Sequence, residues 1–151
     1  MKLIIISMVL VLVLIFGLGY YKNNQVPDKL GVEERRLAEV PSSPNAVSSQ
    51  TKVSDKYVEP LKFKGDLDTS RQIILSILKD DDQITIISEQ KDYIHAVGIT
   101  LGFRFKDDLE FYFAEDEEVI HFRSAARLGY SDFGVNRERY NQLKEEYYAA
   151  D

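Results

Sequence analysis

The N-terminal segment is apolar at almost every position from Leu3 to Tyr20, a run of 18 residues. At about 1.5 Å per residue, a helix of this length spans roughly 27 Å, close to the thickness of a bilayer's hydrocarbon core. Tyr21 and Lys22 follow, as is typical of the interface where a helix leaves the membrane. The pattern predicts a transmembrane anchor over residues 1–21, which contacts the membrane through residues 3–20.

A cleavable signal peptide is the alternative interpretation. Gly17 and Gly19 have the small-residue spacing of a signal-peptidase site, but the apolar run is longer than the usual core of about 7–15 residues. We therefore predict an uncleaved, single-pass helix in the cell membrane. Lys2 and the free amine favour an N-terminus inside, whereas the basic residues that begin at Lys22 argue partly against it. We expect the C-terminal domain to be extracytoplasmic.

Residues 22–56 contain three of the four prolines and show little apolar periodicity, which is typical of a connector. Gly31 to Ala38 is long enough for one or two helical turns. The composition predicts a spacer that lifts the domain off the bilayer.

Beyond Val53, alternating and helical patterns follow one another. A strand is expected at 57–63, where Pro60 indicates a sheet edge. A capping box of Thr69 and Gln72 predicts a helix that ends at Asp80 to Asp82. Two hairpins follow at 84–89/93–100 and 109–114/119–125, and a helix at 136–148. The order β-α-β-β-β-β-α predicts an α+β fold, an antiparallel sheet with helices on one face.

The second hairpin has two different faces. Leu109, Phe111 and Phe113 alternate with polar residues, and Ile120 and Phe122 alternate with His121 and Arg123 on the partner strand. The apolar face must belong to the core, and the other face groups Asp108, Glu110, Tyr112, His121 and Arg123. A turn centred between residues 116 and 117 places Arg123 opposite Glu110, within reach of a cross-strand ion pair.

Two interpretations of this polar face remain open. It is either a site whose carboxylate pair performs acid–base chemistry, or an exposed sheet face with ordinary ion pairs of small energy. His95 and His121 lie on different hairpins without a metal-ligand spacing, so we predict no metal site and no cofactor.

Three arginines, two glycines, an Asp and an Asn fall within residues 122–137, between the last strand and the last helix. Asn136 is a candidate helix cap, and Arg127 and Arg137 near a helix N-terminus can cradle a phosphate or carboxylate. Alternatively, these arginines pair with Asp107, Asp108 and Asp132 and hold the loop closed. The candidate ligand-binding residues are Asp108, Glu110, Arg123, Arg127, Asp132, Asn136 and Arg137; no catalytic residue is assigned.

Three ordered motifs, Pro41 to Ser49, Asp107 to Phe111 and Arg123 to Arg137, closely resemble the signature of domain-of-unknown-function family 1499. The resemblance implies that Pro41 to Gln50 belongs to the domain, so the linker shrinks to 22–39 and the domain covers 40–151. It also implies that Asp107 and the candidate residues share one environment. It supplies no function.

Charge and missing motifs narrow the function classes. From Lys22 onward the chain has 18 basic and 25 acidic residues, a balance of −7, which disfavours nucleic-acid binding. The absence of cysteine excludes disulfides and thiol chemistry. Phosphate-binding, dinucleotide and hydrolase motifs are also missing. We therefore expect a non-catalytic membrane-tethered module that binds a small anionic or amphipathic ligand, or a protein partner. The alternatives are a carboxylate-based hydrolase-like enzyme with an arginine clamp and a structural component of an envelope assembly.

Overall fold

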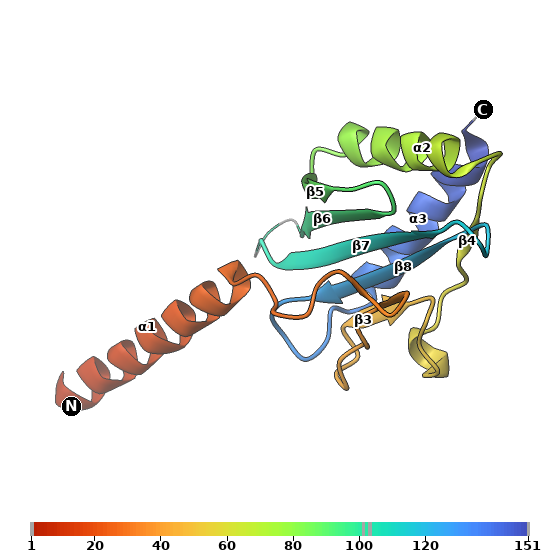
Figure 1. Ribbon diagram of the computed structural model, residues 1–151. Helices are drawn as coiled ribbons and strands as arrows, with labels where there is room; N and C mark the ends of the chain where they lie inside the picture. Colours follow the sequence, from red (N-terminus) through yellow and green to blue (C-terminus); the bar gives the residue numbers. More distant parts are fainter. Residues whose placement is uncertain (1, 101, 103, 151) are drawn as a thin grey trace.

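The computed structural model describes residues 2–100, 102 and 104–150. Helix α1 (Lys2–Asn24) projects away from the remainder of the chain, with its apolar side chains exposed (Figure 1). Its length and composition are those of a membrane-spanning helix, and an N-terminal signal sequence meets the same two criteria.

The centre of the fold is a six-stranded antiparallel sheet in the order β3-β8-β7-β6-β5, with β4 also paired to β8. Its strands are β3 (Ala46–Ser48), β4 (Leu61–Lys62), β5 (Ile84–Glu89), β6 (Tyr93–Ile99), β7 (Lys106–Ala114) and β8 (Val119–Ala126). Both predicted hairpins are present. The strand expected at 57–63 is reduced to β4, because Pro60 has no N–H for pairing and a short 3₁₀ turn, η1 (Ser54–Lys56), precedes it.

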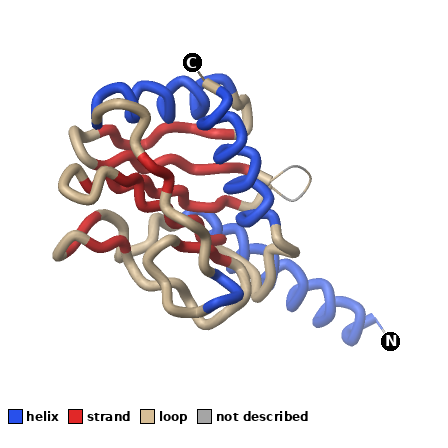
Figure 2. Tube along the Cα trace, turned by 90° about the vertical axis from the view of Figure 1, so that its right-hand side faces the viewer, coloured by secondary structure: helices blue, strands red, loops and turns tan. Residues whose placement is uncertain are grey.

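Helices α2 (Leu67–Asp80) and α3 (Val135–Ala149) pack on the same face of the sheet, as predicted (Figure 2). The predicted capping box at Thr69 is wrong. Asp66 caps α2 instead, because its side chain accepts a hydrogen bond from the Thr69 N–H at 2.8 Å.

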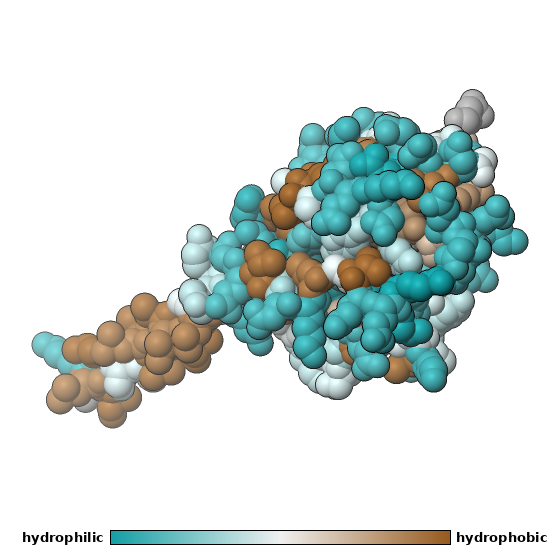
Figure 3. Space-filling model, viewed as in Figure 1, coloured by the Kyte–Doolittle hydropathy of each residue, from teal (hydrophilic) through white to brown (hydrophobic). Residues whose placement is uncertain are grey.

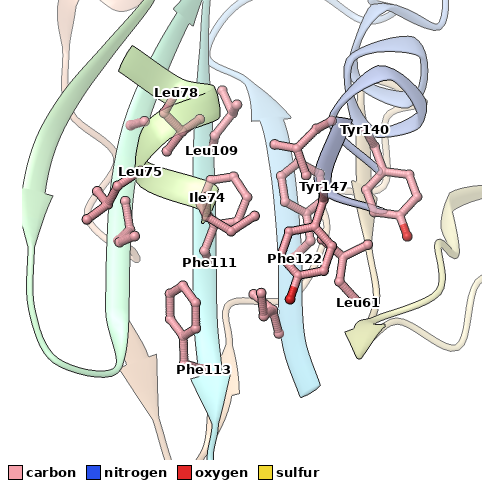
Figure 4. Close-up of a cluster of buried hydrophobic side chains, with 14 of the residues drawn as sticks. Leu61, Ile74, Leu75, Leu78, Leu109, Phe111, Phe113, Phe122, Tyr140 and Tyr147 are labelled. Carbon is pink, nitrogen blue, oxygen red and sulfur yellow. The ribbon is translucent and has the colours of Figure 1, made fainter. Parts of the chain in front are cut away.

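The main core lies between this sheet face and the two helices (Figure 4). The alternating residues Phe111 and Phe122 meet there with ring centroids 5.1 Å apart, and Phe122 lies 5.2 Å from Tyr140 of α3. Ile74 and Leu78 cover the same surface from α2. The amphipathic patterns of strand and helix therefore converge on one apolar layer.

The opposite sheet face is covered by residues 25–41, which we call the strap; part of it is drawn in orange in front of β7 and β8 in Figure 1. Residues 31–38, which are long enough for one or two helical turns, form none. The strap forms a small hairpin of β1 (Val32–Glu33) and β2 (Arg36–Leu37), whose turn residues Glu34 and Arg35 have φ of 47° and 64°. Leu37 packs with Tyr93, Tyr112 and Ala114 in a second apolar cluster. Residues expected to form a linker thus lie against the sheet.

The end of α1 is tied to the start of β7. The Asn23 side chain donates to the Arg104 carbonyl at 3.0 Å and accepts from the Lys106 N–H at 3.0 Å. The Lys106 ammonium also donates to the Asn24 side-chain oxygen at 2.8 Å. Figure 3 shows the hydrophobic surface of α1 next to the largely hydrophilic surface of the domain.

Candidate functional site

The polar face of the second hairpin is buried beneath the strap. Glu110 is 0% exposed, Asp108 1% and Arg123 7%. The expectation of an exposed sheet face with ordinary ion pairs is therefore wrong. The alternation of side chains along the strands places these residues on one face of the sheet, and the strap covers that face and shields it from water.

Glu110 accepts three hydrogen bonds. Its Oε1 accepts from the Tyr93 hydroxyl and from the Gly31 N–H of the strap, both at 2.8 Å. Its Oε2 accepts from Arg123 at 2.6 Å, and the two residues are directly opposite in the register, as predicted. Burial and the neighbouring Glu110 charge raise the pKa of Tyr93, so this hydroxyl stays a donor.

Asp108 also accepts three hydrogen bonds. Arg127 Nε donates to its Oδ2 at 2.8 Å and a terminal Arg127 nitrogen to its Oδ1 at 2.6 Å, a bidentate pair. His95 Nε2 donates to Oδ1 at 2.8 Å. Burial raises the pKa of Asp108, but the bonds and charges of Arg127 and His95 outweigh it and lower the pKa below its ordinary value. Asp108 is therefore an ionised, weakly basic carboxylate.

A groove of about 870 Å³ lies between the strap and the end of β8. Asp108, Arg123 and Arg127 line it from the sheet, and the strap supplies apolar residues, basic residues and carboxylates: Leu30, Val32, Leu37, Lys29, Arg36, Asp28, Glu33, Glu34 and Glu39. Its volume is that of a small-molecule site. The buried arginines belong to the floor, whereas the four strap carboxylates are exposed.

One donor of the groove is unsatisfied. Arg123 Nε is buried and has no hydrogen-bond partner among the residues that the structure describes. A second such atom, His121 Nε2, lies 3.4 Å from Glu117 Oε2 and so has a carboxylate close by. The guanidinium of Arg123 therefore donates to Glu110 through a terminal nitrogen, and its buried Nε–H is left without an acceptor among the described residues.

The other three candidate residues lie elsewhere, at the start of α3. The N-cap of α3 is Gly134 and not Asn136, and the Asp132 side chain accepts from the Asn136 N–H at 2.9 Å. Asn136 is buried in the first turn and bonds Ser124 and the Asn45 carbonyl. Arg137 donates to backbone carbonyls, including that of Asp55 at 2.8 Å. The single environment implied by the family resemblance is thus two clusters on opposite faces of the sheet.

Asp107 also faces α3 and not the groove. Arg139 of α3 pairs with it at 3.0 Å. Burial raises the pKa of Asp107, and the Arg139 charge opposes that shift. Among residues 2–100, 102 and 104–150, no group of three or more His, Cys, Asp or Glu side chains is arranged to hold a metal ion.

Sequence reasoning missed the residues that other segments contribute to this site: Tyr93, His95, Gly31 and Lys29. The hairpin register carried a signal for two of them, because β6 pairs His95 with Glu110 and Tyr93 with Tyr112 on the same face. The strap residues had no such signal, since no local pattern predicts which surface a connector will cross.

The motifs at Pro41 to Ser49 and Arg123 to Arg137 meet in space, because β3 pairs with β8 and the Asn45 side chain donates to the Gly129 carbonyl at 2.8 Å. A family model described as "Protein of unknown function (DUF1499)" matches residues 36–146 and confirms the resemblance. No curated protein and no solved structure matches the chain.

Proposed function

Since the chain belongs to the DUF1499 family of proteins of unknown function, we propose its function from the groove: a non-catalytic, membrane-tethered module that binds a small ligand with an anionic group and an apolar part. The observation that carries the proposal is the buried Arg123 Nε–H at the groove, without a partner among the described residues.

A buried N–H without an acceptor costs about 1–3 kcal/mol, and a ligand oxygen that accepts from it recovers that cost. Guanidinium donors match the oxygens of carboxylates and phosphates, which can accept from two N–H groups at once. Lys29 and Arg36, exposed strap residues of the same groove, add further positive charge. An anionic group is therefore the complement of this floor.

The apolar part of the ligand is inferred from the strap. Leu30, Val32 and Leu37 line the groove together with Ala125 of β8. The exposed carboxylates of the strap repel a bare anion that approaches from water. A ligand that also has an apolar portion gains hydrophobic contact that offsets this repulsion.

Acid–base catalysis has less support. Asp108 and Glu110 each accept three hydrogen bonds from protein groups, so three of the roughly four lone-pair sites of each carboxylate are occupied. The lowered pKa of Asp108 makes it a poor general acid and a weak base near neutral pH. A hydrolase would need at least one carboxylate free to exchange a proton with substrate.

The tether in this proposal is α1, retained as an uncleaved anchor with the domain on the extracytoplasmic side. Two contacts support its retention. Leu128 of the domain packs over Gly19 of α1, and Asn23 bonds the backbone at the start of β7.

The test is a thermal shift on the full chain in detergent micelles, followed by far-UV circular dichroism. Hexyl phosphate is the probe and 1-hexanol is its uncharged control. At about one hundred times its dissociation constant, a ligand adds about 2.7 kcal/mol to the free energy of unfolding. We expect hexyl phosphate, and not hexanol, to raise the melting temperature.

Variants locate the binding. Lys29→Gln changes an exposed residue and should reduce the shift without altering the starting melting temperature, and Arg123→Gln should abolish the shift, whatever its own stability. Arg35→Gln is the matched control, because Arg35 is exposed, pairs with Asp116 and does not line the groove. An equal shift in Arg123→Gln and the wild type, or no shift with hexyl phosphate, would overturn the proposal.

A further inference from the structure

The loop that joins β8 to α3, residues 127–134, exposes two aromatic side chains. Tyr130 is 78% exposed and Phe133 95%. Single exposed apolar residues are ordinary on protein surfaces, so exposure alone does not indicate a partner. The position of this loop relative to α1 is the feature that indicates a partner.

Leu128 fixes that position. A Cβ built on Gly19 would lie 3.7 Å from Leu128 Cδ2, so the Leu128 side chain lies against α1 at Gly19. Gly19 is the penultimate residue of the apolar run that ends at Tyr20. When that run fills the hydrocarbon core, Leu128 lies at the edge of the core, at the depth where interfacial aromatic side chains are found.

The charges of the loop are used inside the protein. Arg127 is paired with Asp108, and Asp132 accepts hydrogen bonds from the first turn of α3. Contact with lipid would therefore not require the burial of a charge of this loop that lacks a hydrogen-bond partner. Such a burial is the main cost that keeps polar loops out of the interface.

Phe133, which directly precedes the N-cap of α3, is held in place by the loop itself. The Phe133 N–H donates to Ser131 Oγ at 3.1 Å, and the Gly134 N–H donates to Asp132 Oδ1 at 3.1 Å. Phe133 has φ of 54°, a conformation that is uncommon for a bulky residue, and this conformation leaves the ring in solvent.

We propose that loop 127–134 is a second membrane contact, which inserts Tyr130 and Phe133 into the lipid interface beside α1. A single helix can tilt and turn in the bilayer, so α1 by itself does not set the orientation of the domain relative to the lipid surface. A second contact, held against α1 by Leu128, gives the domain one orientation relative to the lipid surface. The groove shares Arg127 with this loop, so the same contact places one end of the groove next to the bilayer.

The experiment uses the full chain in vesicles of phosphatidylcholine and phosphatidylglycerol with lipids brominated at a shallow acyl position. The protein contains no tryptophan, so one introduced indole gives the whole tryptophan signal. Phe133→Trp and Tyr130→Trp report on the loop. Phe16→Trp reports on α1, and Tyr148→Trp, on the last turn of α3, is the control on the domain.

We expect the brominated lipid to quench the indole at positions 16, 130 and 133 and to leave position 148 unquenched, with blue-shifted emission at 130 and 133. If position 16 is quenched while 130 and 133 behave like 148, the loop lies in water and the proposal is wrong. An indole at 133 that is blue-shifted but unquenched would show that it is buried against protein and not lipid, and would also overturn the proposal. An unquenched position 16 would remove the premise that α1 lies in the bilayer, and the proposal with it.

Discussion

Glu110→Gln should destabilise the protein strongly although it changes neither the size nor the shape of the side chain. One oxygen of the Glu110 carboxylate accepts hydrogen bonds from Tyr93 and Gly31, and the other accepts from Arg123. An amide has a single acceptor oxygen and an NH₂ group. Whichever way the amide is oriented, a donor of the protein then faces a donor of the side chain.

The magnitude follows from burial. Glu110 is fully buried and the Arg123 side chain is 9% exposed, so removal of the negative charge leaves a buried guanidinium without its counter-ion. The loss of one partner of a buried ion pair costs about 3–5 kcal/mol. For a chain of this length, that loss lowers the melting temperature by roughly 10 °C.

Urea denaturation of the full chain in micelles, followed by circular dichroism, measures the difference. The control is Glu59→Gln, because Glu59 pairs with Lys144 at 3.0 Å but is 70% exposed, and such a pair contributes well under about 1 kcal/mol. A Glu110→Gln variant as stable as Glu59→Gln would refute the view that the buried pair, with the strap bonded to it, stabilises the fold.

Three other substitutions test separate parts of the structure, each by urea denaturation. The folded pKa of Asp108 lies below its ordinary value of 3.8, so its stabilisation is complete above that value and is lost as the pH falls through the folded pKa. Asp108→Asn should be less stable than the wild type at pH 7 and lose less stability on acidification; parallel pH profiles would contradict this. Phe111→Ala should cost about 3–5 kcal/mol through a core cavity, and a loss below about 1 kcal/mol would contradict its place in the core. Asn136→Ala should cost about 2 kcal/mol, since buried partners such as Ser124 lose a hydrogen bond, whereas Gln142→Ala on the exposed face of α3 should change little.

Local periodicity was enough to predict most of the fold. The alternation of Leu109, Phe111 and Phe113 with polar residues assigned one hairpin face to the core, and the register paired Glu110 with Arg123. The helical spacing of Tyr140, Leu143 and Tyr147 likewise predicted the stripe of α3 that is buried. These features depend on neighbours along the chain or across one turn, so the residues themselves determine them.

What covers the polar face was decided only by tertiary structure. The strap has connector composition, and nothing local indicates that Gly31 donates to Glu110 or that Leu37 packs on Tyr93. The separation of Arg127 from Arg137 is of the same kind, because loop 127–134 carries the chain around the sheet to its other face. Alternation and capping act over a few residues. The covering of the polar sheet face by the strap depends instead on contacts across some 80 positions, as between Gly31 and Glu110. No sequence period encodes such contacts.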